Sequence, residues 1–182
     1  MANLQLANER PGERLGKILA YLLSAPVMAF VLILVVTFTY LDKTNHNLLW
    51  ALVALCFVSF FPLAAYLIPQ FLKATKGNRK IQRRTSFIVS LVSFALGALI
   101  LWLGNAPRLL IIIALCYVAT VYSLAFVNLF YKASGHTSGV AGPAVIYLFL
   151  YGPKALPVLF LIPLIMWARI KEKEHSLGQT IA

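Results

Sequence analysis

The chain has 182 residues, of which 61% are hydrophobic, with a mean hydropathy of +0.85 and a net charge of +11. Soluble domains are about 45–50% apolar, so this composition excludes an ordinary soluble protein and predicts a single integral membrane domain over residues 1–182. The basic charge does not indicate nucleic-acid binding, because Lys and Arg stand at the ends of apolar runs, where lipid headgroups and phosphate ligands explain them better.

A polar segment of 16 residues opens the chain, and four long apolar runs follow it. The runs cover Ile18–Leu41, Leu48–Leu72, Ser86–Gly104 and Leu109–Phe130. Each run is close to the roughly 20 residues that a helix needs to cross the bilayer core. We therefore predict four transmembrane helices, and we expect the first to be retained, since no small-residue cleavage site clearly follows it.

Two shorter runs, Ser138–Tyr151 and Ala155–Arg169, come next. A helix of about 15 residues covers only about 22 Å, so these helices start below the membrane surface or thin the bilayer around them. A further helix is expected to begin near His175, and whether it is truncated or simply short at Ala182 is left open. The predicted fold is an all-α polytopic transmembrane bundle of about six spans plus the start of another helix.

The charge distribution predicts which side of the membrane each connection occupies. With six crossings, one side holds 13 of the 16 Lys and Arg residues, because it includes the N-terminus and the connections at residues 73–84, 132–136 and 169–175. The other side holds Lys43, Arg108 and Lys154. The positive-inside rule then places the more basic side of this multi-pass protein in the cytoplasm.

Three polar clusters stand at span ends on that side. They read Lys76-x6-Arg83, Ser134-Gly135-His136 and Arg169-x5-His175. Charge is costly in a bilayer, so such clusters indicate a functional site. Their order and spacing resemble the signature motifs of the type 2 phosphatidic acid phosphatase superfamily, which includes lipid phosphate phosphatases and vanadium haloperoxidases: K-x6-R-P, P-S-G-H and S-R-x5-H-x3-D. The resemblance runs from about Lys76 to Gln179.

The resemblance implies a role for each residue of the clusters. His175 would be the nucleophile that attacks phosphorus, and His136 the general acid that protonates the leaving alkoxide. The phosphoryl oxygens would be bound by the cations Lys76, Arg83 and Arg169 and by the neutral donors Ser134 and Gly135. The implied substrate is a lipid phosphomonoester or diphosphate, with phosphatidate, phosphatidylglycerophosphate and polyprenyl phosphates all open.

The sequence departs from the family pattern at four positions. Arg84, Ala133 and Ala168 replace Pro, Pro and Ser at positions that carry none of the main chemical groups. Gln179 replaces the Asp that accepts the Nδ1 proton of the nucleophilic histidine; its side-chain oxygen can still orient His175, but it carries no charge. A catalytically weak or inactive lipid-phosphate-binding protein is therefore one alternative, and a small anion transporter is another.

The remaining polar residues indicate no metal or cofactor. The five acidic residues have no metal-ligand spacing: Glu9, Glu13, Asp42, Glu172 and Glu174. We expect Glu172 and Glu174 to be solvated partners of the neighbouring cations, and His46 to be inert. Residues 73–84 also fit a basic loop on anionic lipid, so membrane lipids are the other expected partners. The oligomeric state is left open.

Overall fold

The computed structural model describes residues 11–71, 79–172 and 175–181, except for the side chains of residues 11, 13, 68–71 and 79–83. All regular structure in these ranges is helical, which confirms the all-α part of the predicted fold. Four helical stretches are long and apolar enough to cross a membrane, or up to five if one bent pair counts as a single span. They are Asn45–Leu67, Arg84–Leu103, Arg108–Val127 and Gly135–Lys171, and the bent pair is Arg14–Leu22 with Ala25–Tyr40. The expected number of six spans is not confirmed.

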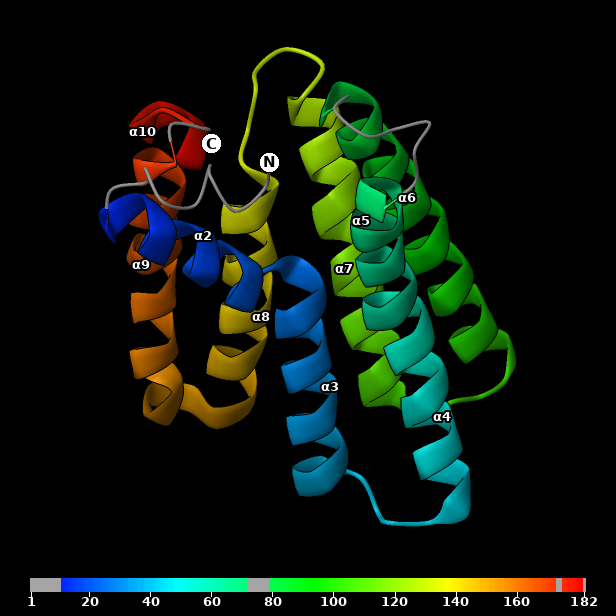
Figure 1. Cartoon of the computed structure of the whole chain (residues 1–182). Helices are drawn as coiled ribbons and strands as arrows, with labels where there is room; N and C mark the ends of the chain where they lie inside the picture. The colour runs from blue at the N-terminus through cyan, green and yellow to red at the C-terminus, as the bar shows by residue number, and fades with distance from the viewer. Residues whose placement is uncertain (1–10, 72–78, 173–174, 182) are drawn as a thin grey trace. The chain divides into compact units, whose positions relative to one another are not determined.

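The chain divides into two compact units, residues 26–125 and residues 1–25 with 126–182. The first is almost entirely made of long apolar helices (Figure 1). Its elements are α3 (Ala25–Tyr40), α4 (Asn45–Leu55), the π-helical turn η1 (Cys56–Phe60), α5 (Phe61–Phe71), α6 (Arg79–Leu103) and α7 (Arg108–Val127). The predicted runs at residues 48–72, 86–104 and 109–130 therefore correspond to α4–α5, α6 and α7.

Close helix contacts in this unit depend on small residues and serine hydroxyls. A side chain at Gly97 would overlap Phe57, because a Cβ there would lie 2.5 Å from the Phe57 Cβ. Ser93 Oγ donates a hydrogen bond to the Phe57 carbonyl, and Ser59 Oγ donates to the Pro26 carbonyl at 2.7 Å. Such contacts hold helices together in lipid, where apolar burial alone gives little drive to associate.

The second unit contains the two polar clusters at the C-terminal end of the sequence. Its elements are α2 (Pro11–Leu22), α8 (Gly135–Tyr151), the 3-10 turn η2 (Gly152–Phe160), α9 (Leu161–Lys171) and α10 (Leu177–Ile181). Helices α2, α8 and α10 all pack against α9, and Figure 1 shows α8 and α9 side by side with η2 joining them at one end. The stretch from Gly135 to Lys171 is therefore a hairpin of two helices, as the two short apolar runs predicted.

The hairpin turn follows from its sequence. Gly152 has a φ of +59°, a conformation that suits glycine, and the prolines at 153 and 157 remove backbone donors that a continuous α-helix would use. At 17 residues, α8 is about 25 Å long, shorter than the bilayer core.

The first predicted span is wrong as a single helix. Helix α2 ends at Leu22 and α3 begins at Ala25, with Pro26 in its first turn, where the missing N–H is tolerated. Part of the polar segment 1–16 is also helical, because α2 begins at Pro11. Gly16 faces α9, where a Cβ would lie 3.1 Å from the Ala168 carbonyl oxygen.

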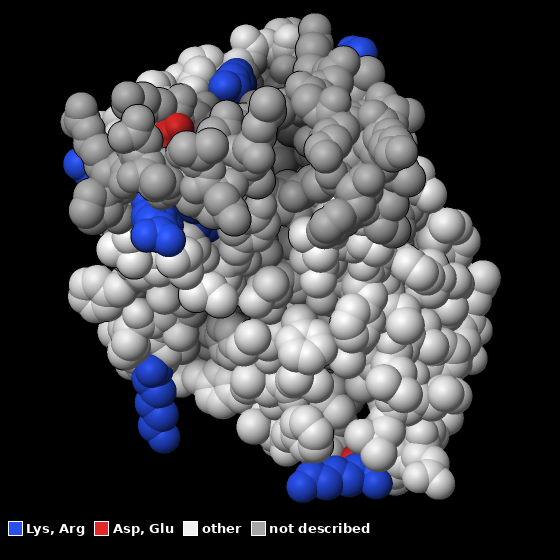
Figure 2. All heavy atoms as spheres, in the orientation of Figure 1, with Lys and Arg blue, Asp and Glu red and all other residues white. Residues whose placement is uncertain are grey.

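The described surface is mostly apolar, as a bilayer requires. Large side chains such as Trp102, Phe149 and Phe160 are exposed by 64%, 88% and 75%. On the face drawn in Figure 2, few of the described side chains carry charge, and uncharged side chains cover wide areas between them. This distribution agrees with the prediction of an integral membrane protein.

Candidate functional site

The N-terminus of α8 is built around Ser134. This residue has the extended backbone of a helix cap, and its hydroxyl oxygen accepts a hydrogen bond from the Thr137 amide at 3.4 Å. Its carbonyl accepts from both the amide and the hydroxyl of Ser138. Ser134 is 2% exposed, so the cap is buried. The Gly135 amide follows at the first helical position, where helix geometry provides no acceptor and the helix dipole favours an anion.

A backbone hydrogen bond connects the second and third sequence clusters. The Ser134 amide donates to the Gln179 carbonyl oxygen at 2.8 Å. Gln179 lies in α10, which begins with a capping box: the Ser176 amide donates to Gln179 Oε1 at 3.1 Å, and the Gln179 amide donates to Ser176 Oγ at 3.4 Å. The segment that follows His175 is thereby held against the start of α8.

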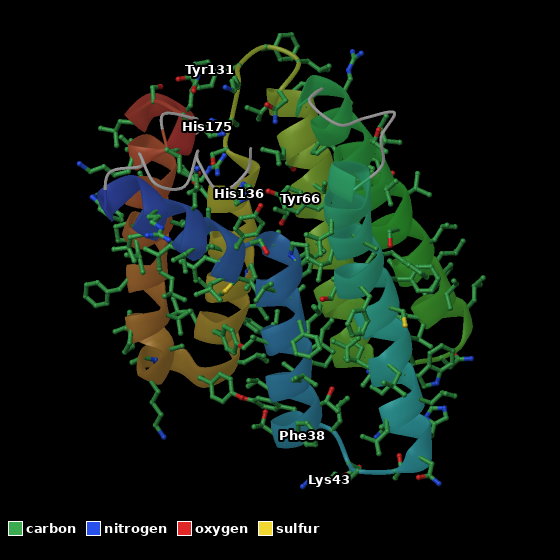
Figure 3. The ribbon with its side chains drawn as sticks, in the orientation of Figure 1. Phe38, Lys43, Tyr66, Tyr131, His136 and His175 are labelled. Atoms are coloured by element: carbon green, nitrogen blue, oxygen red, sulfur yellow. The ribbon has the colours of Figure 1, made fainter. Side chains whose placement is uncertain are left out.

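Both predicted catalytic histidines lie at the same end of this unit (Figure 3). His136 is the second residue of α8 and is half-buried, and His175 is half-buried just before α10, with its Nδ1 atom fully buried. The Gln179 side-chain oxygen accepts from the Ser176 amide. Its expected role in orienting His175 stays a prediction.

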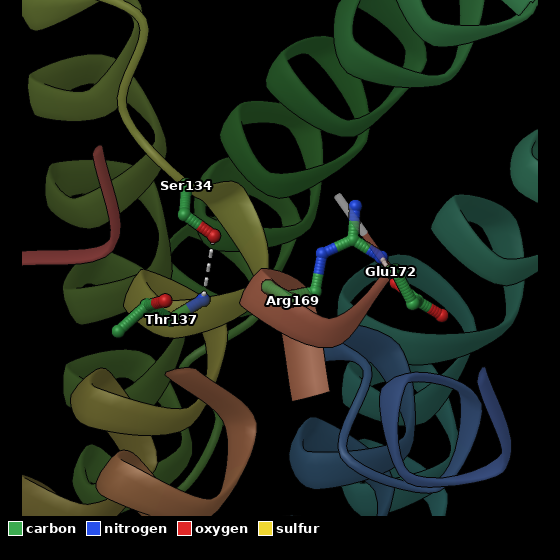
Figure 4. Close-up of polar contacts among 4 residues, drawn as sticks. All are labelled: Ser134, Thr137, Arg169 and Glu172. Atoms are coloured by element: carbon green, nitrogen blue, oxygen red, sulfur yellow. Dashed lines mark hydrogen bonds and ion pairs between the residues drawn. The ribbon is translucent and has the colours of Figure 1, made fainter. Parts of the chain in front are cut away.

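Arg169 lies in the last turn of α9 and is 8% exposed, an unusual position for a charged side chain. Its Nη1 atom forms an ion pair with Glu172 (Figure 4). Its Nε atom is buried and makes no hydrogen bond within the described residues. Buried polar atoms are normally satisfied, so this N–H is available to an acceptor other than the residues that the structure describes.

Glu172 corrects the sequence analysis, which expected a solvated carboxylate. Its side chain is only 7% exposed and contacts a guanidinium that is 10% exposed. The cause is a tertiary contact: the Cγ of Glu172 lies 3.5 Å from the place that a Cβ would take on Gly16, so α2 covers it. The pairing with Arg169 itself was among the expected contacts.

Thr137 is a further polar residue of this site that the sequence analysis missed. It is 8% exposed, and its hydroxyl is buried without a hydrogen bond to any residue that the structure describes. Figure 4 draws Thr137 and Ser134 in one turn of α8, with Arg169 on the neighbouring helix. The available signal was its position, three residues after a serine cap, where a side chain in the first turn lies near the open helix end.

The chain that leads into Ser134 is also fixed by specific contacts. Asn128 Oδ1 accepts a hydrogen bond from the Ala133 amide at 3.1 Å, which closes the turn between α7 and α8. The Tyr131 hydroxyl lies 2.9 Å from the place of a Cβ on Gly178, beside α10. The position of the serine cap is therefore determined on both sides.

The first sequence cluster cannot be placed in the same way. Lys76 lies outside the described residues, and Arg83 lies in α6 with its side chain likewise outside them. The other six predicted residues all belong to the unit formed by residues 1–25 and 126–182: Ser134, Gly135, His136, Arg169, His175 and Gln179. Across the described ranges, no group of three His, Cys, Asp or Glu residues is arranged to hold a metal ion.

Comparison with protein-family models, curated proteins and solved structures finds no match for this chain.

Proposed function

We propose that the protein is a metal-independent phosphatase of a membrane lipid, acting on a phosphomonoester or diphosphate through a phosphohistidine intermediate. The observation that carries the proposal is the buried Arg169, whose Nε donor has no partner among the described residues, in a unit that also holds the Ser134 cap. The hydrogen bond from the Ser134 amide to the Gln179 carbonyl also supports the proposal, because it connects the segments that contain His136 and His175.

The proposed reaction has two steps. The neutral imidazole of His175 attacks phosphorus, so that a P–N bond forms and the P–O bond to the lipid breaks, while His136 gives its proton to the leaving oxygen. Water then attacks the phosphohistidine, so that a new P–O bond forms and the P–N bond to His175 breaks, while His136 takes the proton of that water and inorganic phosphate leaves. Arg169 and the α8 N-terminus stabilise the charge on the phosphoryl oxygens.

The substrate class follows from the position of these polar groups. They lie at one end of a hairpin whose helices expose apolar side chains such as Phe149 along their length. A phosphorylated headgroup bound at this end leaves an acyl or prenyl tail beside those side chains. We propose six crossings in all, with the site on the cytoplasmic side, as the distribution of Lys and Arg predicts.

The test is phosphate release by the detergent-purified chain from phosphatidate and from farnesyl diphosphate, in the presence of EDTA. Wild type is expected to release phosphate and His175→Ala to release none. His46→Ala is the matched control, because His46 accepts a hydrogen bond from Trp50 Nε1 at 3.1 Å in another part of the chain. A folded wild-type protein that releases no phosphate from either lipid would contradict the proposal.

A second candidate is a lipid-phosphate-binding protein without turnover. One observation favours it: the Gln179 side-chain oxygen accepts from Ser176, and no carboxylate stands at this position to stabilise a charged histidine. This protein would bind inorganic phosphate with equal affinity in wild type and in His175→Ala, and neither would turn over.

A further inference from the structure

The ion pair between Arg169 and Glu172 is not part of the sequence motifs, yet both side chains are almost fully buried beside the candidate site. We propose that Glu172 is a positioning residue that presents Arg169 to a phosphoryl group. The proposal rests on the phosphate-binding role of Arg169 and adds a residue to it.

The guanidinium group of Arg169 has five N–H donors in a plane. The Nε and Nη2 donors on one edge match two oxygens of a phosphoryl group. Glu172 contacts Arg169 through Nη1, which leaves that edge to another acceptor. Nε is buried and makes no hydrogen bond within the described residues, as expected for a donor that binds a ligand.

The side chain of Glu172 is itself held in place. Its Cγ packs against α2 at Gly16, which has no side chain to block it, and Gly16 lies against the Ala168 carbonyl. A free arginine side chain samples many rotamers, and fixing it on binding costs free energy. Glu172 removes much of that cost in advance, because the ion pair fixes the guanidinium before phosphate arrives.

Electrostatics alone predicts the opposite effect of Glu172. A negative charge beside Arg169 repels phosphate, so its removal would strengthen phosphate binding if the carboxylate acted only as a competitor. Positioning predicts that Glu172→Ala weakens binding, although this change removes a repulsive charge. It also predicts that Glu172→Gln, which keeps an oxygen acceptor for Nη1, rescues binding. The sign of the effect therefore separates the two roles.

The experiment titrates the full chain in detergent with inorganic phosphate and follows the ¹⁵N–¹H signal of Arg169 Nε, identified by its loss in Arg169→Lys. Phosphate is expected to shift this signal in wild type. Glu172→Ala is expected to raise the phosphate Kd and the KM for lipid substrate about tenfold, as loss of a hydrogen bond between charged groups typically does, with kcat changed much less. Glu172→Gln and the control Glu174→Gln are expected to stay close to wild type in both quantities.

Three results would overturn the proposal: no phosphate-dependent shift of the Nε signal in wild type, an unchanged or lower Kd in Glu172→Ala, or the same loss in Glu172→Gln as in Glu172→Ala. Where Glu172→Ala fails to fold because a buried arginine is left unpaired, the decision passes to Glu172→Gln, whose Kd must stay near wild type. A wild type that shifts with phosphate but does not turn over lipid contradicts the phosphatase and leaves the positioning role supported.

Discussion

Replacement of Ser134 by Asp separates the helix-capping role of the α8 N-terminus from its proposed role in binding an anion. Asp is as good a helix cap as Ser, so the carboxylate can accept the Thr137 amide hydrogen bond that Ser134 Oγ now accepts. The same carboxylate places a negative charge where the proposal puts a phosphate group. We therefore expect Ser134→Asp to keep the cap and lose the ligand, with a stability cost because the carboxylate is buried, while Ser134→Ala loses the cap.

The magnitudes follow from the geometry of the cap. The hydrogen bond is long, 3.4 Å, so its loss in Ser134→Ala should cost about 0.5–1 kcal/mol, the lower part of the range for caps, and lower the Tm by about 1–4 °C. In Ser134→Asp, two unit charges about 4 Å apart at an effective dielectric of about 20 repel by about 4 kcal/mol. That energy corresponds to a loss of phosphate affinity of about 10³-fold.

The assay is thermal unfolding of the detergent-purified variants, together with titration by inorganic phosphate. Thr44→Asp is the control for the added charge, because the exposed Thr44 caps α4 by the same contact, to the Asn47 amide at 3.2 Å, and has no part in the proposed site. The control is expected to bind phosphate like wild type. Undiminished phosphate binding by folded Ser134→Asp would refute the placement of the anion, and a wild-type Tm in Ser134→Ala would refute the capping role of the hydroxyl.

Two further predictions concern contacts around the site. Gln179→Ala removes the acceptor of the Ser176 amide and should lower the Tm by about 1–4 °C. Gln179→Glu keeps an acceptor for this amide and should match the Tm of wild type. Equal Tm values for the two variants would contradict the capping role of Gln179. Gly16→Ala brings a Cβ to 3.1 Å from the Ala168 carbonyl and should destabilise, while Gly12→Ala meets nothing within 4 Å and should be neutral or stabilising. Denaturant unfolding of both alanine variants measures this difference, and equal stability would contradict the close packing of α2 on α9.

The sequence predicted the helices well where composition alone decides them. The runs at residues 86–104 and 109–130 became α6 and α7, because about 20 apolar residues in a row leave few alternatives to a membrane-spanning helix. The break between α2 and α3 was missed, since residues 18–41 are apolar on both sides of Ser24 and hydropathy does not register a local change of direction.

The candidate site was predictable in its residues but not in its contacts. Spacing within the motifs singled out Ser134, Arg169 and Gln179, and all three lie in one unit. The burial of Glu172 could not be predicted, because it depends on Gly16, more than 150 residues away in the sequence. The capping box of Ser176 and Gln179 was legible in the sequence as S-x-x-Q, but the family pattern directed attention to the histidine instead.

A membrane environment would explain why folding and the proposed anion binding use the same groups. A helix that begins within or near the bilayer has first-turn amides that water cannot reach easily, and each unsatisfied donor is costly there. Ser134 satisfies the Thr137 amide, and the Gln179 carbonyl accepts the amide of Ser134 itself. These contacts leave the Thr137 hydroxyl and Arg169 Nε as buried donors with no acceptor in the described residues. An anion bound by these groups would complete the hydrogen bonding of a helix start that the described residues complete only in part.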